Sequence, residues 1–579
     1  MHHSLIQLSN IVAICLLISS VGRSEPLPPI REWIEQFTAD LETLDHRYRV
    51  PLDVVAKDIR QGVLQSWIRK LQDRDFESLD RVDKIDYLLL RTEIEYRSKK
   101  LQLDWSRDSE AQQSFLPYAT QLIQFCKARE DVEPIDAQQS ANVLDQVAAQ
   151  VEQLSTRLSQ LEKQADSKEK IQKQLQGLRA SELASALESR MNEAHRFYTG
   201  FDPLYSWWAA KPYERLEAAL KNHRRLLREK VVEVPESDND TIIGLPIGAH
   251  GLQLELEHEW IAHSPEELVA LAEREMQWCE AELGKATAAL GFEDDWRAAT
   301  EFVKSKHVAP GDQPQLIRDL AWEAIRFLQA HDLVTIPELA ANGWRMNMMS
   351  PERQRVSPYF LGGDTIIVSF PTDGMTHEEK LMSMRSNNEH FARATVHHEL
   401  IPGHHLQHYM TPRYRPYRQL FATPFWIEGW ALYWEMLLWD LNFAHGPEDR
   451  VGMLFWRKHR CARIIFSLSY HLGTMSPEEC IQYLVDKVGH ERSAATAEVR
   501  RSIMGGYSPL YQAAYMLGGL QLRAMHKELV QSGLRTNREY HDAVLHENSI
   551  PIEVLRLYLV DQPLRPDQKP SWRFAELSE

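Results

Sequence analysis

Apolar residues recur at helical spacing through most of the first 230 residues. Residues 30–230 are rich in Leu, Ala, Glu, Gln, Lys and Arg and contain few glycines, a composition typical of α-helices. Within residues 147–161 the apolar positions alternate at spacings of four and three, and Ile171, Leu175 and Leu178 resume this pattern after a polar stretch. We therefore expect a long antiparallel helical hairpin that packs within one molecule.

The middle of the chain has a different pattern. Residues 240–260 contain glycines and alternating apolar positions, and residues 365–370, TIIVSF, have the β-branched composition of a strand. Between these segments, Ser264 followed by Pro-Glu-Glu predicts the start of a helix. From His377 onward the helical pattern returns. We expect a mainly α fold with a small β-sheet element.

The N-terminus carries a short apolar run, IVAICLLISSV, at residues 11–21. This run is too short to cross a bilayer but has the length of the apolar part of a secretory signal peptide. We expect a signal peptide at residues 1–24 and an exported protein, periplasmic or extracellular, without stable membrane insertion. The rest divides into a helical region at 25–230 that contains the long hairpin, a mixed α/β segment at 231–376 and a helical region at 377–579 that carries the candidate chemistry.

Charge and cysteine content exclude several classes of protein. The formal net charge is −17, from 66 basic and 83 acidic residues, and the basic residues are dispersed. A phosphate backbone would be repelled by such a chain, so we expect no nucleic acid partner. Beyond the predicted signal peptide, four cysteines remain without a Cys-x-x-Cys pair, which is too few for a disulfide framework.

Residues 395–409, TVHHELIPGHHLQHY, hold five of the 24 histidines beside one glutamate. His398 and His404 are six residues apart, so on a straight helix they would differ by about 240° and could not share a metal ion. Pro402 and the glycine after it disfavour a regular helix. A widened or kinked turn there would let the two imidazoles converge, with Glu399 placed as a general base.

Other arrangements of this segment are open from the sequence. His404 and His408 are four residues apart and need no distortion to share a helix face, and His397 and His405 are further candidate ligands. The imidazoles can also lie at the surface or be satisfied in a polar core without any metal.

A second segment, FWIEGWALYWE, supplies a carboxylate. Glu428 lies 24 residues after His404 in a stretch with helical character, among Trp426, Trp430 and Trp434. A buried glutamate in such apolar surroundings needs a charged partner, either a metal ion or an arginine. Two histidines and a carboxylate from a neighbouring helix form a common zinc ligand set.

These two segments, His-Glu-x-x-Pro-Gly-His-His-x-x-Gln and Glu-Gly-Trp-Ala-Leu-Tyr, closely resemble the motifs of the bacterial family called domain of unknown function 885, which is grouped with gluzincin-type metallopeptidases of the MA clan. AEVRRSI, PLYQAAYMLGG and REYHDAVLHENSIPIEVLRLYL near the C-terminus continue the resemblance. The resemblance covers most of the mature chain. It implies one Zn²⁺ per chain, with His398, His404 and Glu428 as ligands and Glu399 as the base that activates water.

The resemblance implies further roles in the same site. Tyr515 matches a family tyrosine that could donate a hydrogen bond to a developing oxyanion. Arg501 matches a family arginine that binds substrate carboxylate or holds the site together. The spacing after this arginine is longer than in the family pattern, so Arg500 is an alternative.

The resemblance also implies two mostly helical lobes around a deep cleft with zinc at its floor. The strand at residues 365–370 would then be an edge strand against which a peptide lies, with Val368 and Ser369 as substrate-binding residues. The alternative is a buried core strand. The function expected from the resemblance is an exported zinc metallopeptidase. The alternatives are a helical peptide-binding protein without turnover and a site that only stores or holds metal.

Overall fold

The computed structural model describes residues 29–161, 168–354 and 360–575, so the predicted signal peptide at residues 1–24 lies outside the described residues. Helices make up most of the described chain, and one small two-stranded sheet accompanies them. The predicted mainly α class with a minor β element is confirmed.

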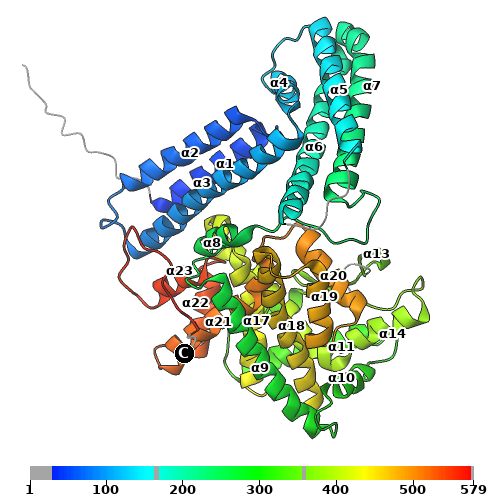
Figure 1. Ribbon diagram of the computed structural model, residues 1–579. Helices are drawn as coiled ribbons and strands as arrows, with labels where there is room; N and C mark the ends of the chain where they lie inside the picture. The colour runs from blue at the N-terminus through cyan, green and yellow to red at the C-terminus, as the bar shows by residue number, and fades with distance from the viewer. Residues whose placement is uncertain (1–28, 162–167, 355–359, 576–579) are drawn as a thin grey trace, which may run out of the picture.

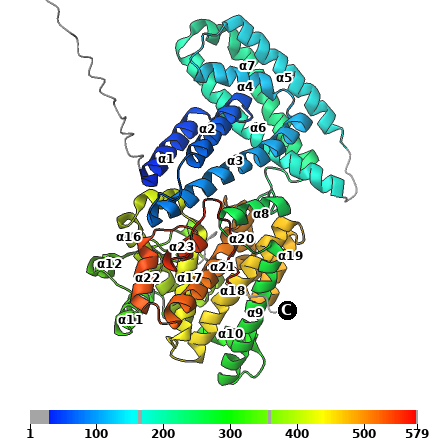
Figure 2. The ribbon, with the colours of Figure 1, turned by 90° about the vertical axis from the view of Figure 1, so that its left-hand side faces the viewer.

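The first seven helices form the upper part of the molecule in Figure 1. They are α1 (Ile30–Arg47), α2 (Val54–Gln72), α3 (Arg81–Phe115), α4 (Ala119–Glu130), α5 (Ala137–Ser159), α6 (Lys168–Phe201) and α7 (Pro203–Leu226). In both views α4, α5, α6 and α7 form a bundle that extends away from the larger lobe and that α3 enters (Figures 1 and 2).

The second part of the chain forms the lower, larger lobe. Its helices are α8 (Gly248–His258), α9 (Pro265–Ala289), α10 (Trp296–Ser305), α11 (Gln313–Ala330), α12 (Glu338–Gly343), α13 (Pro351–Gln354), α14 (His377–Ser386), α15 (Glu389–Glu399), α16 (His404–Met410), α17 (Pro424–Asp440), α18 (Pro447–Leu472), α19 (Pro477–Tyr483), α20 (Arg492–Met504), α21 (Tyr511–His526), α22 (Asn537–His546) and α23 (Ile552–Leu559). The long helices α9, α17, α18 and α21 pack together at its centre (Figure 1).

Local capping chemistry explains where several helices start. The predicted cap at Ser264 is present: its hydroxyl accepts from the N–H of Glu267, whose side chain in turn accepts from the N–H of Ser264. Thr376, Ser476 and Thr536 begin α14, α19 and α22 in the same way. Such capping boxes satisfy N–H groups that have no partner inside the helix.

The hydrophobic cores do not follow the boundary predicted at residue 230. Apolar residues of α1, α2 and the first half of α3 share one core with α9, α17, α18 and α21. The second half of α3 and helices α4 to α7 enclose a separate core. The long helix α3 therefore belongs to both cores and connects the bundle to the larger lobe.

The first helix of the predicted hairpin, α5, packs most closely against α7, whereas we expected it to pack against the next helix, α6. Val147 and Val151 of α5 are buried, as their spacing predicted, but α5 packs along α7, and α6 packs mainly against α3, α4, α7 and the π-helical turn Leu227–Val232. The closest pair is thus α5 with α7, which run in the same direction: Arg215 pairs with Asp145 and Glu152, and one to two turns further along Ser155 lies beside His223.

The alternating pattern at residues 240–260 does not form a strand. Most of it forms α8, in which Leu252 and Leu256 are buried at helical spacing. When leucines occur at every second position, every second leucine is four residues from the last and lies on the same face of a helix. The pattern therefore fits a helix as well as a strand.

The small sheet lies directly on the helix that ends at the His-rich turn. β1 (Arg345–Met348) pairs in parallel with β2 (Thr365–Val368), with Arg345 opposite Thr365. Ile366 and Val368 of β2 belong to a small core with Ala392, Val396 and Leu400. The sheet therefore supports α15 from one side.

A fully buried ionic group joins α3 to the larger lobe. Arg418 Nε contacts Asp86 Oδ1 at 2.7 Å, and both side chains are completely buried. The hydroxyl of Tyr417 donates to the other oxygen of Asp86 at 2.8 Å, and Arg418 also pairs with Glu547. Arg415 pairs with Glu547 as well, at 2.8 Å, so two guanidinium groups balance the two buried carboxylates.

Within the residues that the structure describes, we find no helix with the length and apolarity required to cross a bilayer.

The change Asp86→Asn tests this connection. It removes one charge from a fully buried pair and should lower the free energy of unfolding by about 3 kcal/mol or more, because Arg418 loses a charged partner. Urea unfolding followed by circular dichroism measures this loss. As a control, Glu35→Gln removes one member of the exposed pair Arg31–Glu35 and should leave the unfolding midpoint unchanged. Equal midpoints for Asp86→Asn and the unaltered protein would contradict the structural importance of this group.

Candidate metal centre

A break between two helices separates the histidines of the His-rich segment. α15 ends at Glu399, and α16 begins at His404. Pro402 has no N–H with which to continue a helix, and a Cβ atom at Gly403 would lie 1.7 Å from the carbonyl oxygen of His398. We predicted a widened or kinked turn within one helix. The structure instead ends the helix, because the chain folds back so closely that only glycine fits.

One hydrogen bond connects this turn to α17. The indole Nε1 of Trp430 donates to the carbonyl oxygen of Pro402 at 2.7 Å. Trp430 is fully buried and lies two residues after Glu428 on the same helix. The break between α15 and α16 and the carboxylate on α17 are therefore held in a fixed relation.

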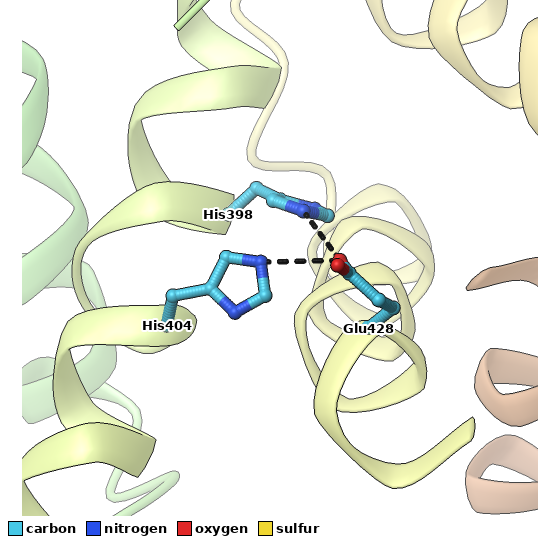
Figure 3. A group of neighbouring side chains, drawn as sticks. All are labelled: His398, His404 and Glu428. Carbon is cyan, nitrogen blue, oxygen red and sulfur yellow. Dashed lines mark ion pairs between the residues drawn. The ribbon is translucent and has the colours of Figure 1, made fainter. Parts of the chain in front are cut away.

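The structure brings His398, His404 and Glu428 together (Figure 3). Glu428 Oε2 lies 3.2 Å from His404 Nε2 and 3.8 Å from His398 Nε2. One nitrogen or oxygen atom from each residue lies within 4.8 Å of the others. Zinc bonded at about 2.1 Å in a tetrahedral site places its ligand atoms roughly 3.4 Å apart. The three side chains therefore have a spacing that suits a metal ion.

The environment of these atoms also fits a cation. All three side chains are buried, and Glu428 Oε2 is a buried oxygen without a hydrogen bond in the described structure. A buried carboxylate oxygen that accepts no hydrogen bond is costly, and a bound cation lowers that cost. Two imidazoles and one carboxylate are a ligand set that zinc uses with one position left open.

Glu435 and Gln407 orient the two imidazoles from behind. Glu435 Oε1 lies 2.7 Å from His398 Nδ1, and Gln407 Nε2 lies 3.0 Å from His404 Nδ1. A carboxylate on the far nitrogen fixes the ring and makes its other nitrogen a better metal ligand. We did not predict Glu435 from the sequence. Its position seven residues after Glu428 is the available signal, because two helical turns return to nearly the same face.

The charges in this group stabilise one another. Burial opposes a charged imidazole, but contacts with Glu428 and Glu435 prevail and raise the pKa of His398 to about 9. Burial also opposes a charged carboxylate, yet His404 and His398 hold the pKa of Glu428 well below its usual range. Both directions show that the centre favours a positive charge between its two carboxylates.

Glu399 faces the same centre without a partner of its own. It is partly exposed, and among the described residues nothing donates a hydrogen bond to its carboxylate or pairs with it. A Cβ atom at Gly362 would lie 2.1 Å from Glu399 Oε2 and 2.8 Å from its carbonyl oxygen. The backbone before β2 therefore packs directly against the carboxylate and needs glycine at this position.

Two glycines let α17 and α21 approach closely. A Cβ atom at Gly518 would lie 1.9 Å from the carbonyl oxygen of Phe425, and one at Gly429 would lie 2.6 Å from Gly518. This contact places two tyrosines of α21 beside the centre. The hydroxyl of Tyr511 donates to Glu428 Oε1 at 2.5 Å.

Tyr515, the predicted tyrosine, lies against a different member of the group. Its ring is nearly parallel to that of His398, at an interplanar angle of 12° and a centroid distance of 6.3 Å. Tyr511 was not predicted from the sequence. Its position one helical turn before Tyr515 is the signal that identifies it.

The predicted Arg501 is partly exposed and lies at the edge of an ionic cluster next to Tyr515. Arg501 donates to the hydroxyl of Tyr507 at 3.2 Å and lies 3.8 Å from Glu498. The alternative, Arg500, points elsewhere and donates to the carbonyl oxygens of residues 239 and 240. Of the two arginines, only Arg501 lies on the side of the metal group.

Two arginines of α18, which we did not predict, lie closer to the centre. The guanidinium carbons of Arg460 and Arg463 are 5.0 and 4.5 Å from the centroid of the Tyr515 ring. Arg463 Nε donates to Glu498 at 2.6 Å, and Arg460 lies 3.8 Å from Glu435. Basic residues in a long helix give no sequence signal for such a role, because most lie at the surface.

The predicted substrate-binding pair has buried side chains. Val368 is completely buried in the small core beneath β2, and Ser369 is 1% exposed and donates to Gln354 Oε1 at 2.8 Å. On the side of β2 away from β1, Ile367 exchanges two backbone hydrogen bonds with Leu361, at 2.8 and 3.1 Å. The edge that we expected to be open is therefore occupied at this point.

The other candidate histidines lie outside the metal group. His405 Nε2 contacts the carbonyl oxygen of Ala340 at 3.1 Å, and the ring of His397 packs edge-on against Phe443. The ring of His408 lies 6.2 Å from that of His404 and is not in the three-residue group.

The change Glu435→Gln tests the support behind His398. It should lower zinc affinity about 10- to 100-fold, because the ring loses the charge that orients it. Competition with a fluorescent zinc chelator measures this affinity. As a control on the same helix, Asp440→Asn removes a partly exposed partner of Arg523 and should leave affinity unchanged. Full affinity in Glu435→Gln would mean that this contact does not support a metal ligand.

Comparison with solved structures shows the same fold in two other proteins. The structure described as "a putative lipoprotein of unknown function from Shewanella oneidensis" has a TM-score of 0.64 and 18% identity, and covers 92% of this chain and 100% of its own. "The putative lipoprotein from Colwellia psychrerythraea" has a TM-score of 0.50 and 15% identity, and covers 80% of this chain and 98% of its own. No curated protein matches the sequence.

The sequence profile of one family covers nearly the whole described chain. This family is described as "Bacterial protein of unknown function (DUF885)", and its profile matches residues 45–558. The match includes the His-rich turn, Glu428 and α21. The chain belongs to this family.

Proposed function

We propose that the protein is an exported zinc-dependent hydrolase of the gluzincin type that cleaves peptide or related amide bonds. The observation that carries the proposal is the convergence of two buried imidazoles and one buried carboxylate beside Glu399, a carboxylate with no hydrogen bond or ion pair to the described residues. A structural ion pair needs no such free carboxylate, whereas hydrolysis needs a base.

The metal ligands and Glu399 have different roles in the proposed reaction. A zinc ion held by His398, His404 and Glu428 would supply Lewis acidity, which polarises a carbonyl and lowers the pKa of water. The Glu399 carboxylate accepts the proton of the attacking water and then delivers it to the departing amine. Its contact with Gly362 holds this carboxylate at one place beside the metal group.

Two tyrosines and nearby cations complete the proposed site. Burial raises the pKa of Tyr515, so its hydroxyl stays protonated and can donate to the oxygen that gains charge during attack. Tyr511 holds one oxygen of Glu428 and leaves Oε2 for the metal ion. The contacts of Arg501 with Tyr507 and Glu498 favour a role in holding the site together over direct binding of substrate.

We propose a peptide as the substrate and the cell envelope or exterior as the location. The apolar run at residues 11–21 supports export, and the two solved structures named above are each described as a "putative lipoprotein", a class of exported proteins. The net charge of −17 argues against a nucleic acid substrate.

The change Glu399→Gln separates metal binding from catalysis. The variant should retain one zinc per chain, because Glu399 is not in the ligand group, and should lose cleavage by roughly 10²- to 10⁴-fold. Metal is measured by mass spectrometry of the purified protein, and cleavage by incubation with a mixed peptide library. The control Glu389→Gln, at the exposed start of α15, should retain both properties. Stoichiometric zinc in the unaltered protein without cleavage of any peptide would favour a peptide-binding protein instead.

The change Gly362→Ala tests the position of the proposed base. The added methyl group would collide with Glu399, and a displacement of about 1 Å lowers kcat by roughly 10²-fold. Zinc content should stay unchanged. Gly343→Ala is the matched control, because no atom lies within 4 Å of its added methyl group. Full activity in Gly362→Ala would contradict the proposed placement of Glu399.

A further inference from the structure

A cavity of about 300 Å³ lies between the end of β2 and helices α13, α14 and α20, on the right of the larger lobe in Figure 1. It contains none of the three residues of the metal group. Its volume corresponds to roughly ten water molecules and falls at the lower end of the range for small-molecule sites.

The walls of this cavity are mostly apolar. They include Met375, Met382, Phe391, Phe455, Ala494 and Ala497. The charged residues at its border have partners within the protein. Lys304 Nζ pairs with Glu301 at 2.8 Å, and Glu379 accepts from the N–H of Thr376 in the capping box of α14. The cavity is therefore suited to an apolar group rather than to a charged one.

Two elements, α15 and β2, connect the cavity to the metal centre. Phe391 and His398 are seven residues apart on α15, so they differ by about 20° around the helix and by roughly 10 Å along it. Ser369, which also lines the cavity, directly follows β2. Phe455 of α18 stacks on Phe391 at 4.6 Å and closes the wall on that side.

We propose that this cavity is a specificity pocket that binds one large apolar side chain of the substrate, such as Phe, Leu or Met. The inference rests on the proposed peptidase function. An extended peptide advances about 3.3 Å per residue, so the bound side chain lies about three residues from the bond that is cleaved. The pocket then selects peptides by one apolar residue at a fixed distance from the reaction.

A peptide series tests the pocket. In short fluorogenic peptides, one Phe is moved through the positions of an Ala-rich sequence, and kcat/KM is compared with that of the all-Ala peptide. At one position Phe should raise kcat/KM roughly 10- to 200-fold. In Ala497→Trp the indole fills the cavity, and this ratio should fall to near one. Ala497 is only partly buried, so α20 accommodates a larger side chain.

The control Arg492→Trp places the same side chain on α20 outside the cavity and should retain the full Phe-to-Ala ratio. Far-ultraviolet circular dichroism and the thermal midpoint of each variant show whether it is folded. Absence of a preferred Phe position in the unaltered protein would overturn the pocket and leave the hydrolase proposal intact. An unchanged ratio of kcat/KM between the Phe and all-Ala peptides in folded Ala497→Trp would also overturn the pocket and leave the hydrolase proposal intact.

Failure of the hydrolase proposal gives a different result. If no peptide is cleaved, the affinities of the Glu399→Gln protein for the same peptides are measured by fluorescence anisotropy. Tighter binding of one Phe peptide, lost in Ala497→Trp, would support the pocket without catalysis. Equal affinities for all peptides would overturn the pocket as well.

Discussion

The hydrogen bond from Trp430 Nε1 to the carbonyl oxygen of Pro402 joins the break between α15 and α16 to the helix that carries Glu428. Without this break, His398 and His404 would lie on different faces of one helix. With it, the second helix starts anew at His404, and both imidazoles point toward one carboxylate. The same hydrogen bond gives the buried indole N–H of Trp430 a partner, which offsets the cost of removing that group from water.

Close helix packing adds the remaining side chains of the site. Gly429 and Gly518 bring α17 and α21 together, and Gly452 of α18 would place a Cβ atom 2.4 Å from the carbonyl oxygen of His390 on α15. Side chains at these positions would force the helices apart. Helices α15, α16, α17 and α21 thus deliver two imidazoles, three carboxylates and two tyrosines to one small volume, and the buried arginines of α18 offset negative charge there.

Periodicity predicted the helical class and the strand at residue 365, because it is a local property. The spacing of the histidines left several ligand sets open, and the resemblance to the family implied the three-residue group that the structure brings together. Three features could not be predicted from local sequence patterns. The pairing of α5 with α7 joins two helices that are not consecutive in the chain. The burial of Val368 and Ser369 depends on the packing of β2 against α15 and on Gln354, which accepts from Ser369. The placement of Glu435, Tyr511 and Arg460 depends on crossings between helices. Such contacts join residues distant in sequence. Helical spacing identifies Glu435 and Tyr511 only after Glu428 and Tyr515 have been assigned, and it gives no signal for Arg460.

In this structure α15, α16 and α17 bring His398, His404 and Glu428 together around a site for one metal ion. X-ray diffraction at the zinc absorption edge, from crystals of the full chain grown with zinc, tests this claim most directly. The account predicts one anomalous peak about 2.0–2.2 Å from His398 Nε2, His404 Nε2 and Glu428 Oε2. A peak between His404 and His408, with the ring of His398 turned away from it, would contradict the account.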